Sequence, residues 1–158
     1  MLIYLLRHAD ALMNGYNERT PPLSEEGKAS IYKLADYIKS KKIRFTNIIS
    51  SPLLRAWQTA TIIAEISNHS PVIIESNNLL PECDPEKLLN DLTNFSDDGK
   101  LLLVGHQPLL GATISTLISK RDALIEMKKA SFACVEINKP ISAGKGVLKF
   151  LLNPEMFV

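Results

Sequence analysis

Near its N-terminus the chain reads LIYLLRHA over residues 2–9. The first five of these residues form a continuous apolar run, which is typical of a β-strand buried on both faces. Short apolar runs recur at residues 72–74 and 101–104, and residues 45–49 are also expected to form a strand. Two further strands are expected over residues 131–137 and 147–152, joined by a loop that contains proline and glycine.

The segments between these runs carry helix signals. Ser24 is a suitable N-cap before Glu25 and Glu26, whose charges favour a helix N-terminus. The apolar residues behind this cap fall on one helical face, namely Ile31, Leu34, Ala35 and Ile38. Further helices are expected over residues 52–66, 85–92 and from about 108 to 119. Strands that alternate with helices predict one three-layer α/β/α domain over residues 1–158, with a mostly parallel sheet.

Charge and composition exclude several classes of protein. Lysine and arginine number 18 and aspartate and glutamate 17, so the formal charge is +1. Without a basic excess, neither a nucleic-acid nor a membrane partner is expected. The opening apolar run is too short for a signal peptide, and no stretch approaches the roughly 18 apolar residues that span a bilayer. Cys83 and Cys134 form no metal or redox motif, so we expect a cytoplasmic protein.

Polar residues follow three of the predicted buried strands. Arg7 and His8 come after the first, Ser51 after the second with Arg55 one turn into the next helix, and His106 after the fourth. Ligands of open α/β sheets bind beyond the carboxyl ends of the strands. We therefore expect two histidines and two arginines to meet at one edge of the sheet.

This set of side chains suits phosphoryl transfer without a metal ion. The guanidinium fork matches phosphate oxygens, and a neutral imidazole is a competent nucleophile. A second histidine, if protonated, can stabilise the transferring group, and helix N-termini after Ser51 and Gly105 would add N–H donors. Taken singly, each residue has an ordinary structural explanation, such as surface pairing for Arg55. His69 stands in a polar stretch and is expected at the surface.

Four short motifs resemble those of the histidine phosphatase superfamily, in the order found in that family. They are LRHA at residues 6–9, PLSEEG at 22–27, SSPLLRAWQTA at 50–60 and VGHQP at 104–108, and they span about two thirds of the chain. The resemblance implies a phosphoglycerate mutase-like fold and no cofactor. It makes His8 the nucleophile and places Arg7, Arg55 and His106 in the phosphate pocket.

The resemblance extends more loosely to Glu82, in the sequence LPE at residues 80–82. Many members of the family place their proton-donating glutamate there, so Glu82 is a candidate general acid. The alternative is a loop carboxylate that pairs with a pocket arginine. The residues after Glu82 depart from the pattern of the mutase branch.

The compact connections leave no room for an added subdomain and predict an open pocket. In this respect the chain is similar to the SixA-type phosphohistidine phosphatases of signal transduction, which act on a histidine of a protein partner. A phosphohistidine leaves as imidazole and needs less acid catalysis than an alkoxide. The alternatives are a broad phosphatase for small phosphorylated substrates and a non-catalytic phosphate-binding module. A metal hydrolase is disfavoured, because two arginines beside the histidines would repel a cation.

Overall fold

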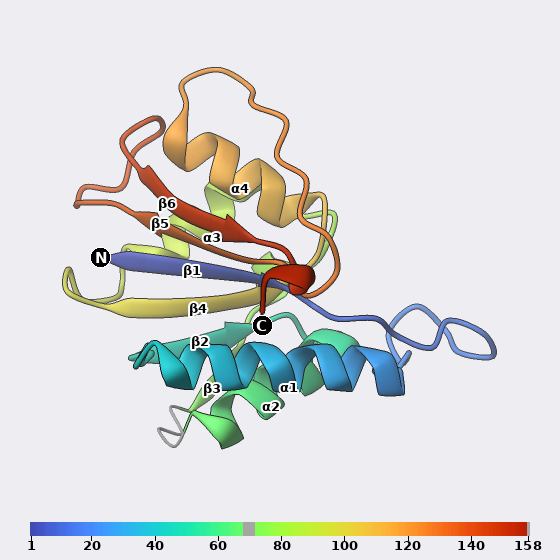
Figure 1. Cartoon of the computed structure of the whole chain (residues 1–158). Helices are drawn as coiled ribbons and strands as arrows, with labels where there is room; N and C mark the ends of the chain where they lie inside the picture. The colour runs from blue at the N-terminus through green and yellow to red at the C-terminus, as the bar shows by residue number, and fades with distance from the viewer. Residues whose placement is uncertain (68–71, 158) are drawn as a thin grey trace.

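A six-stranded sheet forms the centre of the molecule (Figure 1). The computed structural model describes residues 1–67 and 72–157. The strands are β1 (Leu2–Arg7), β2 (Asn47–Ser50), β3 (Ile73–Glu75), β4 (Lys100–Gly105), β5 (Phe132–Glu136) and β6 (Val147–Leu152), in the spatial order β3-β2-β4-β1-β5-β6. The pairs β1–β4, β2–β4 and β2–β3 are parallel, whereas β5 is antiparallel to both of its neighbours. The predicted α/β fold with a mostly parallel sheet is confirmed.

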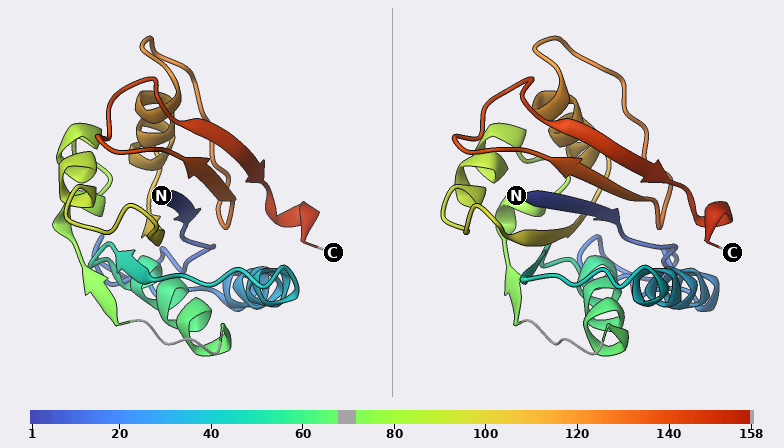
Figure 2. Two further views of the ribbon diagram at one scale, coloured as in Figure 1. Left: turned by 90° about the vertical axis from the view of Figure 1, so that its left-hand side faces the viewer. Right: turned by 60° about the vertical axis from the view of Figure 1, so that its left-hand side comes forward.

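Helices cover both faces of this sheet (Figure 2). They are α1 (Glu25–Ser40) and α2 (Leu54–Ile66) on one face, and α3 (Pro85–Leu92) and α4 (Leu109–Ile118) on the other, with short 3₁₀ helices η1 (Asn77–Leu79) and η2 (Pro154–Met156). Successive side chains of β1 alternate between the two layers. Tyr4 and Leu6 pack with residues of α1 and α2, whereas Ile3 and Leu5 pack with residues of α3 and α4. Burial on both faces explains why the strand sequence is continuously apolar.

Side-chain caps mark where α1 and α3 begin. The Ser24 hydroxyl accepts from the Gly27 N–H at 3.0 Å, as the sequence predicts, and the Asp84 carboxylate accepts from the Glu86 N–H at 2.9 Å. At Gly27 a Cβ atom would collide with the backbone carbonyl oxygen of Asp10. The glycine of the PLSEEG motif therefore lets α1 begin directly against the loop that follows His8.

Two elements begin two residues later than predicted, whereas the other predicted boundaries of strands lie within one residue of the observed ones. The second strand begins at Asn47 instead of Phe45, whose ring packs edge-on against Tyr4 at 5.2 Å before the strand starts. The helix expected from residue 52 begins at Leu54, because the Leu53 N–H first donates to the Ser51 hydroxyl at 3.3 Å. His69 lies outside the described residues. Of the helices that the structure describes, none has the length and apolar character needed to cross a membrane.

Candidate active site

Strand register brings the two site histidines together. Arg7 of β1 pairs with Gly105 of β4, and the His8 N–H donates to the Gly105 carbonyl at 3.0 Å. A histidine directly follows the last residue of each of these two strands. The ring centroids of the two, His8 and His106, are 4.9 Å apart. The first turn of α2 returns Arg55 to the same edge, with its Nε 3.3 Å from His8 Nε2. The expected convergence at the carboxyl ends of the strands is therefore observed.

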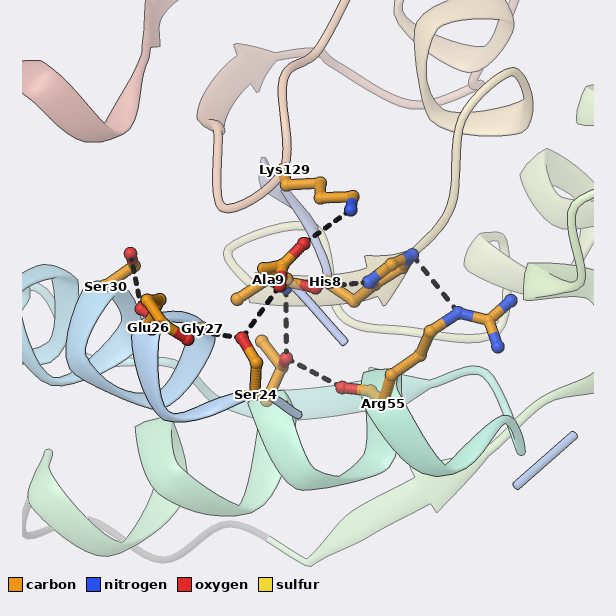
Figure 3. Close-up of polar contacts among 10 residues, drawn as sticks. His8, Ala9, Ser24, Glu26, Gly27, Ser30, Arg55 and Lys129 are labelled. Atoms are coloured by element: carbon orange, nitrogen blue, oxygen red, sulfur yellow. Dashed lines mark hydrogen bonds and ion pairs between the residues drawn. The ribbon is translucent and has the colours of Figure 1, made fainter. Parts of the chain in front are cut away.

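Hydrogen bonding fixes the protonation state of the His8 ring (Figure 3). His8 Nδ1 lies 2.7 Å from the backbone carbonyl oxygen of Ala9. A carbonyl can only accept, so Nδ1 carries the proton and Nε2 keeps its lone pair. Arg55 Nε donates to that lone pair, while Arg55 Nη1 donates to the Glu18 carbonyl at 2.9 Å. The ring is thus held with its unprotonated nitrogen beside a guanidinium group.

A serine orients the second histidine. Ser51 Oγ already accepts from the Leu53 N–H, and it lies 2.8 Å from His106 Nε2. The serine hydroxyl can donate to Nε2, and in that tautomer the proton of the neutral ring lies on Nδ1. His106 is only 2% exposed. Sequence reasoning placed Ser51 at this edge but did not identify this contact, which depends on the pairing of β2 with β4.

Two buried side-chain nitrogen atoms at this edge, His106 Nδ1 and Arg7 Nε, lack a hydrogen-bond partner in the described part of the chain. The rest of the Arg7 guanidinium is anchored, because Nη1 donates to the Met127 carbonyl at 2.7 Å. An unsatisfied buried donor is costly, and an anion with several oxygens would satisfy both. The arrangement suits a bound phosphoryl group.

These side chains line a pocket of about 250 Å³. Its walls are formed by Arg7, His8, Ala11, Met13, Arg55, Pro81, His106, Gln107 and Lys129. No carboxylate among the described residues lines it. Lys129 was not identified from the sequence, because no motif surrounds it and only the tertiary fold brings it to the pocket.

Glu82 lies apart from this group. It is exposed and lines a neighbouring pocket of about 370 Å³, which shares Arg55 and Pro81 with the first. The ion pairs of residues 1–67 and 72–157 include none from Glu82 to an arginine. The structure therefore brings together four of the five predicted site residues and leaves Glu82 on the adjoining surface.

Side chains supply most of the polar groups in the pocket. Backbone donors at the start of α2 are largely used within the chain, since the Leu54 N–H donates to the Arg19 carbonyl at 3.1 Å and the Leu53 N–H to Ser51. The contribution expected from this helix N-terminus is therefore smaller than predicted. Over the described ranges, no three His, Cys, Asp or Glu side chains are grouped so that they could hold a metal ion.

Burial and neighbouring charge keep both imidazoles neutral. Desolvation lowers the pKa of His8 to about 4; the hydrogen bond to Ala9 opposes this shift, and the positive charges of Arg55 and Arg7 add to it. Desolvation also lowers the pKa of His106 to about 3, with further lowering by His8 and the same two arginines. His8 is thus unprotonated at neutral pH, which is the form an imidazole nucleophile requires. His106 is likewise neutral at this pH.

We expect neither of these histidines to titrate near pH 6.5 in the phosphate-free protein. Both pKa values are lowered, so the rings remain neutral until the pH falls toward 4. Adding inorganic phosphate should raise the pKa of His106, because the anion offsets the positive charges that lower it. Imidazole ¹H–¹⁵N spectra across the pH range measure this, with His8→Asn and His106→Asn assigning the resonances. A phosphate-free midpoint between pH 6 and 7 for His8 would contradict the geometry described above.

The fold and the site together define a class of protein. A neutral imidazole beside a guanidinium group, with a second imidazole and unpartnered donors around it, forms a site for nucleophilic phosphoryl transfer. The family model described as histidine phosphatase superfamily (branch 1) matches residues 3–84, just over half of the chain. The chain belongs to this superfamily, and the resemblance inferred from the four motifs is confirmed.

Two relatives and one solved structure show which members of the superfamily this chain is similar to. The phosphohistidine phosphatase SixA of Escherichia coli (strain K12) is 27% identical over 124 residues, covering 74% of this chain and 74% of the relative. An uncharacterised protein of Picosynechococcus is 34% identical over 117 residues, covering 70% and 69%. A solved structure of the protein histidine phosphatase SixA complexed with tungstate matches with a TM-score of 0.87 at 22% identity, covering 98% of this chain and 97% of that one. This structural likeness shows that the fold is shared.

Proposed function

We propose that this chain is a phosphohistidine phosphatase that removes a phosphoryl group from a histidine of a partner protein. The observation that carries the proposal is the composition of the pocket, whose lining includes two histidines, two arginines and a lysine but no described carboxylate. An alkyl phosphate releases an alkoxide and needs a proton donor, whereas a phosphohistidine releases imidazole. The similarity to the SixA phosphohistidine phosphatase supports the same assignment.

The contacts of His8 indicate how the first step proceeds. Arg7, Arg55 and the Nδ1–H of His106 hold the phosphoryl oxygens, which places the phosphorus in front of His8 Nε2. The Nε2 lone pair forms the new N–P bond as the N–P bond of the substrate breaks. The substrate ring, protonated on its other nitrogen, leaves as neutral imidazole. The Ala9 carbonyl accepts from His8 Nδ1 at 2.7 Å and stabilises the positive charge that develops on the phosphorylated ring.

Water completes the cycle. A water molecule attacks the phosphorus, the His8 N–P bond breaks, and inorganic phosphate leaves while Nε2 regains its lone pair. Because positive side chains supply the charge stabilisation, the cycle involves no metal ion. Cys83 and Cys134 are free thiols. Free thiols are typical of a reducing compartment, and we propose the cytoplasm as the site of action.

The test is a comparison of leaving groups. We expect a higher kcat/KM for a phosphohistidine-bearing protein than for any member of a panel of small phosphomonoesters, measured by phosphate release. Activity should persist in excess EDTA. A preference for an alkyl phosphate would favour the small-molecule phosphatase instead, and loss of activity in EDTA that a divalent ion restores would revive a metal-dependent mechanism. Phosphate binding without turnover of any substrate would identify a binding module.

The same panel of substrates tests our proposal that Glu82 is the general acid. Because Glu82 is exposed and lines the adjoining pocket, Glu82→Gln should change phosphohistidine hydrolysis by less than about twofold. If its loop moves over the substrate, alkyl phosphate hydrolysis should slow by roughly the 10²–10⁴-fold of general acid catalysis, with aryl phosphates little affected. A uniform loss across all leaving groups would instead indicate that Glu82 positions an arginine.

A further inference from the structure

The turn before β5 is hydrogen-bonded to Arg7, the last residue of β1, and to His8, which follows it. The Ala130 N–H is shared between the carbonyl oxygens of Arg7 and His8, at 3.1 and 3.2 Å. The Arg7 N–H donates to the Ser131 carbonyl at 3.1 Å, and the Arg7 side chain donates to the Met127 carbonyl. Ala130 has a φ of 61°, a left-handed conformation that is unfavourable for a residue with a Cβ atom. The bonds to β1 hold the turn in this conformation.

This turn places Lys129 at the catalytic pocket. Lys129 lines the pocket together with Arg7 and His8, although 120 residues separate it from Ala9 along the chain. Figure 3 shows its side chain extending from the turn toward the loop that follows His8. The positive charge of Lys129 is also among those that lower the pKa of His8, as expected for an ammonium group close to the nucleophile.

Asp10 is the partner of Lys129 in the unliganded protein. Lys129 Nζ lies 2.6 Å from Asp10 Oδ1, and the other carboxylate oxygen accepts from the Ser24 hydroxyl at 2.8 Å. Both side chains of the ion pair are 47% exposed. Half-exposed ion pairs contribute little to stability, and a lysine has a long flexible stem. Lys129 can therefore leave the Asp10 carboxylate for another anion at little cost in free energy.

We propose that Lys129 is a further substrate-binding residue, which Asp10 holds beside the pocket until a phosphoryl group arrives. The inference rests on the proposed phosphoryl-transfer site. A phosphoryl group at His8 carries up to two negative charges and presents several acceptor oxygens, so it competes with the single carboxylate for the ammonium group. Asp10 thus prevents the site from binding anions too tightly, including the product phosphate.

The two partners should have opposite effects on phosphate affinity, measured by calorimetry at low salt. Lys129→Met should weaken binding of inorganic phosphate roughly tenfold, the loss expected for one charge-assisted contact. Asp10→Asn should tighten binding severalfold, because it releases Lys129 while the amide oxygen still accepts from Ser24. Combined with Lys129→Met, the Asp10→Asn change should tighten binding much less. Lys129→Arg should keep most of the affinity.

Lys128→Met is the matched control. Lys128 is the preceding residue, but its ammonium group pairs with Glu155 at 2.9 Å and does not line the pocket. Its substitution should leave phosphate affinity within about twofold of the unchanged protein. Thermal unfolding of each variant checks that the turn remains folded.

Three outcomes would overturn the proposal. Equal affinities for the unchanged protein and Lys129→Met, or weaker binding in both single variants, would make the Lys129–Asp10 pair a structural surface ion pair. Those results would leave the phosphatase function intact, because turnover is measured separately with phosphohistidine. Failure of the unchanged protein to bind phosphate at all would overturn both this inference and the proposed function.

Discussion

His8→Ala is expected to abolish turnover, with kcat lowered by at least roughly 10³-fold, as is usual when a nucleophile is removed. His8 Nε2 is the unprotonated nitrogen that faces Arg55 at 3.3 Å, and alanine provides no atom that can accept the phosphoryl group. The fold should persist, because the ring lies beyond the end of β1 and the backbone bond from His8 to Gly105 remains. Initial rates measure the loss, and thermal unfolding checks the fold.

Trapping with ³²P-labelled substrate tests the same residue directly. We expect an acid-labile label on the unchanged protein, located on His8 by peptide mapping and absent from His8→Ala. His106→Asn is the control, since it removes the neighbouring imidazole but keeps the nucleophile, and should still accept label. Label on Ser51 or Asp10 would contradict the mechanism, because both have side chains near this edge that could accept a phosphoryl group.

Arg55→Ala is expected to lower kcat by roughly 10²–10³-fold, comparable to removal of one preorganised donor from an oxyanion site. Arg55 Nε orients the His8 lone pair, and the guanidinium offers further donors to the phosphoryl oxygens. Arg55→Lys should recover only part of the activity, because a point charge cannot reproduce the planar fork. Arg7→Ala should act in the same direction, and affinity for phosphate or vanadate should fall with activity.

Rates with the phosphohistidine substrate and calorimetry with vanadate measure the two effects of Arg55. Arg44→Ala is the control, since Arg44 is exposed in the connection between α1 and β2 and lines neither pocket at the site. Full activity in Arg55→Lys would mean that the contact with His8 Nε2 has no catalytic role. The planar guanidinium group would then offer no advantage over a lysine ammonium group at this site.

The sequence by itself determined the fold and four of the five candidate residues. The run of residues 2–6 has no polar position, so the strand had to be buried on both faces, which requires helices on each side of a parallel sheet. Parallel strands present their carboxyl ends at the same edge. Residues that directly follow two adjacent strands, such as His8 and His106, therefore meet whatever the details of side-chain packing.

Tertiary structure alone decided the residues whose position depends on loops and side-chain rotamers. Lys129 reaches the pocket only because Ala130 bonds to the end of β1, and the Ser51 contact that orients His106 requires the observed pairing of β2 with β4. Glu82 could be placed in or beside the pocket by the same sequence, and its loop leaves it on the adjoining surface. Hydrophobic periodicity specifies which elements are buried and in what order. It carries no information about how far an exposed loop extends or which acceptor a flexible side chain finds.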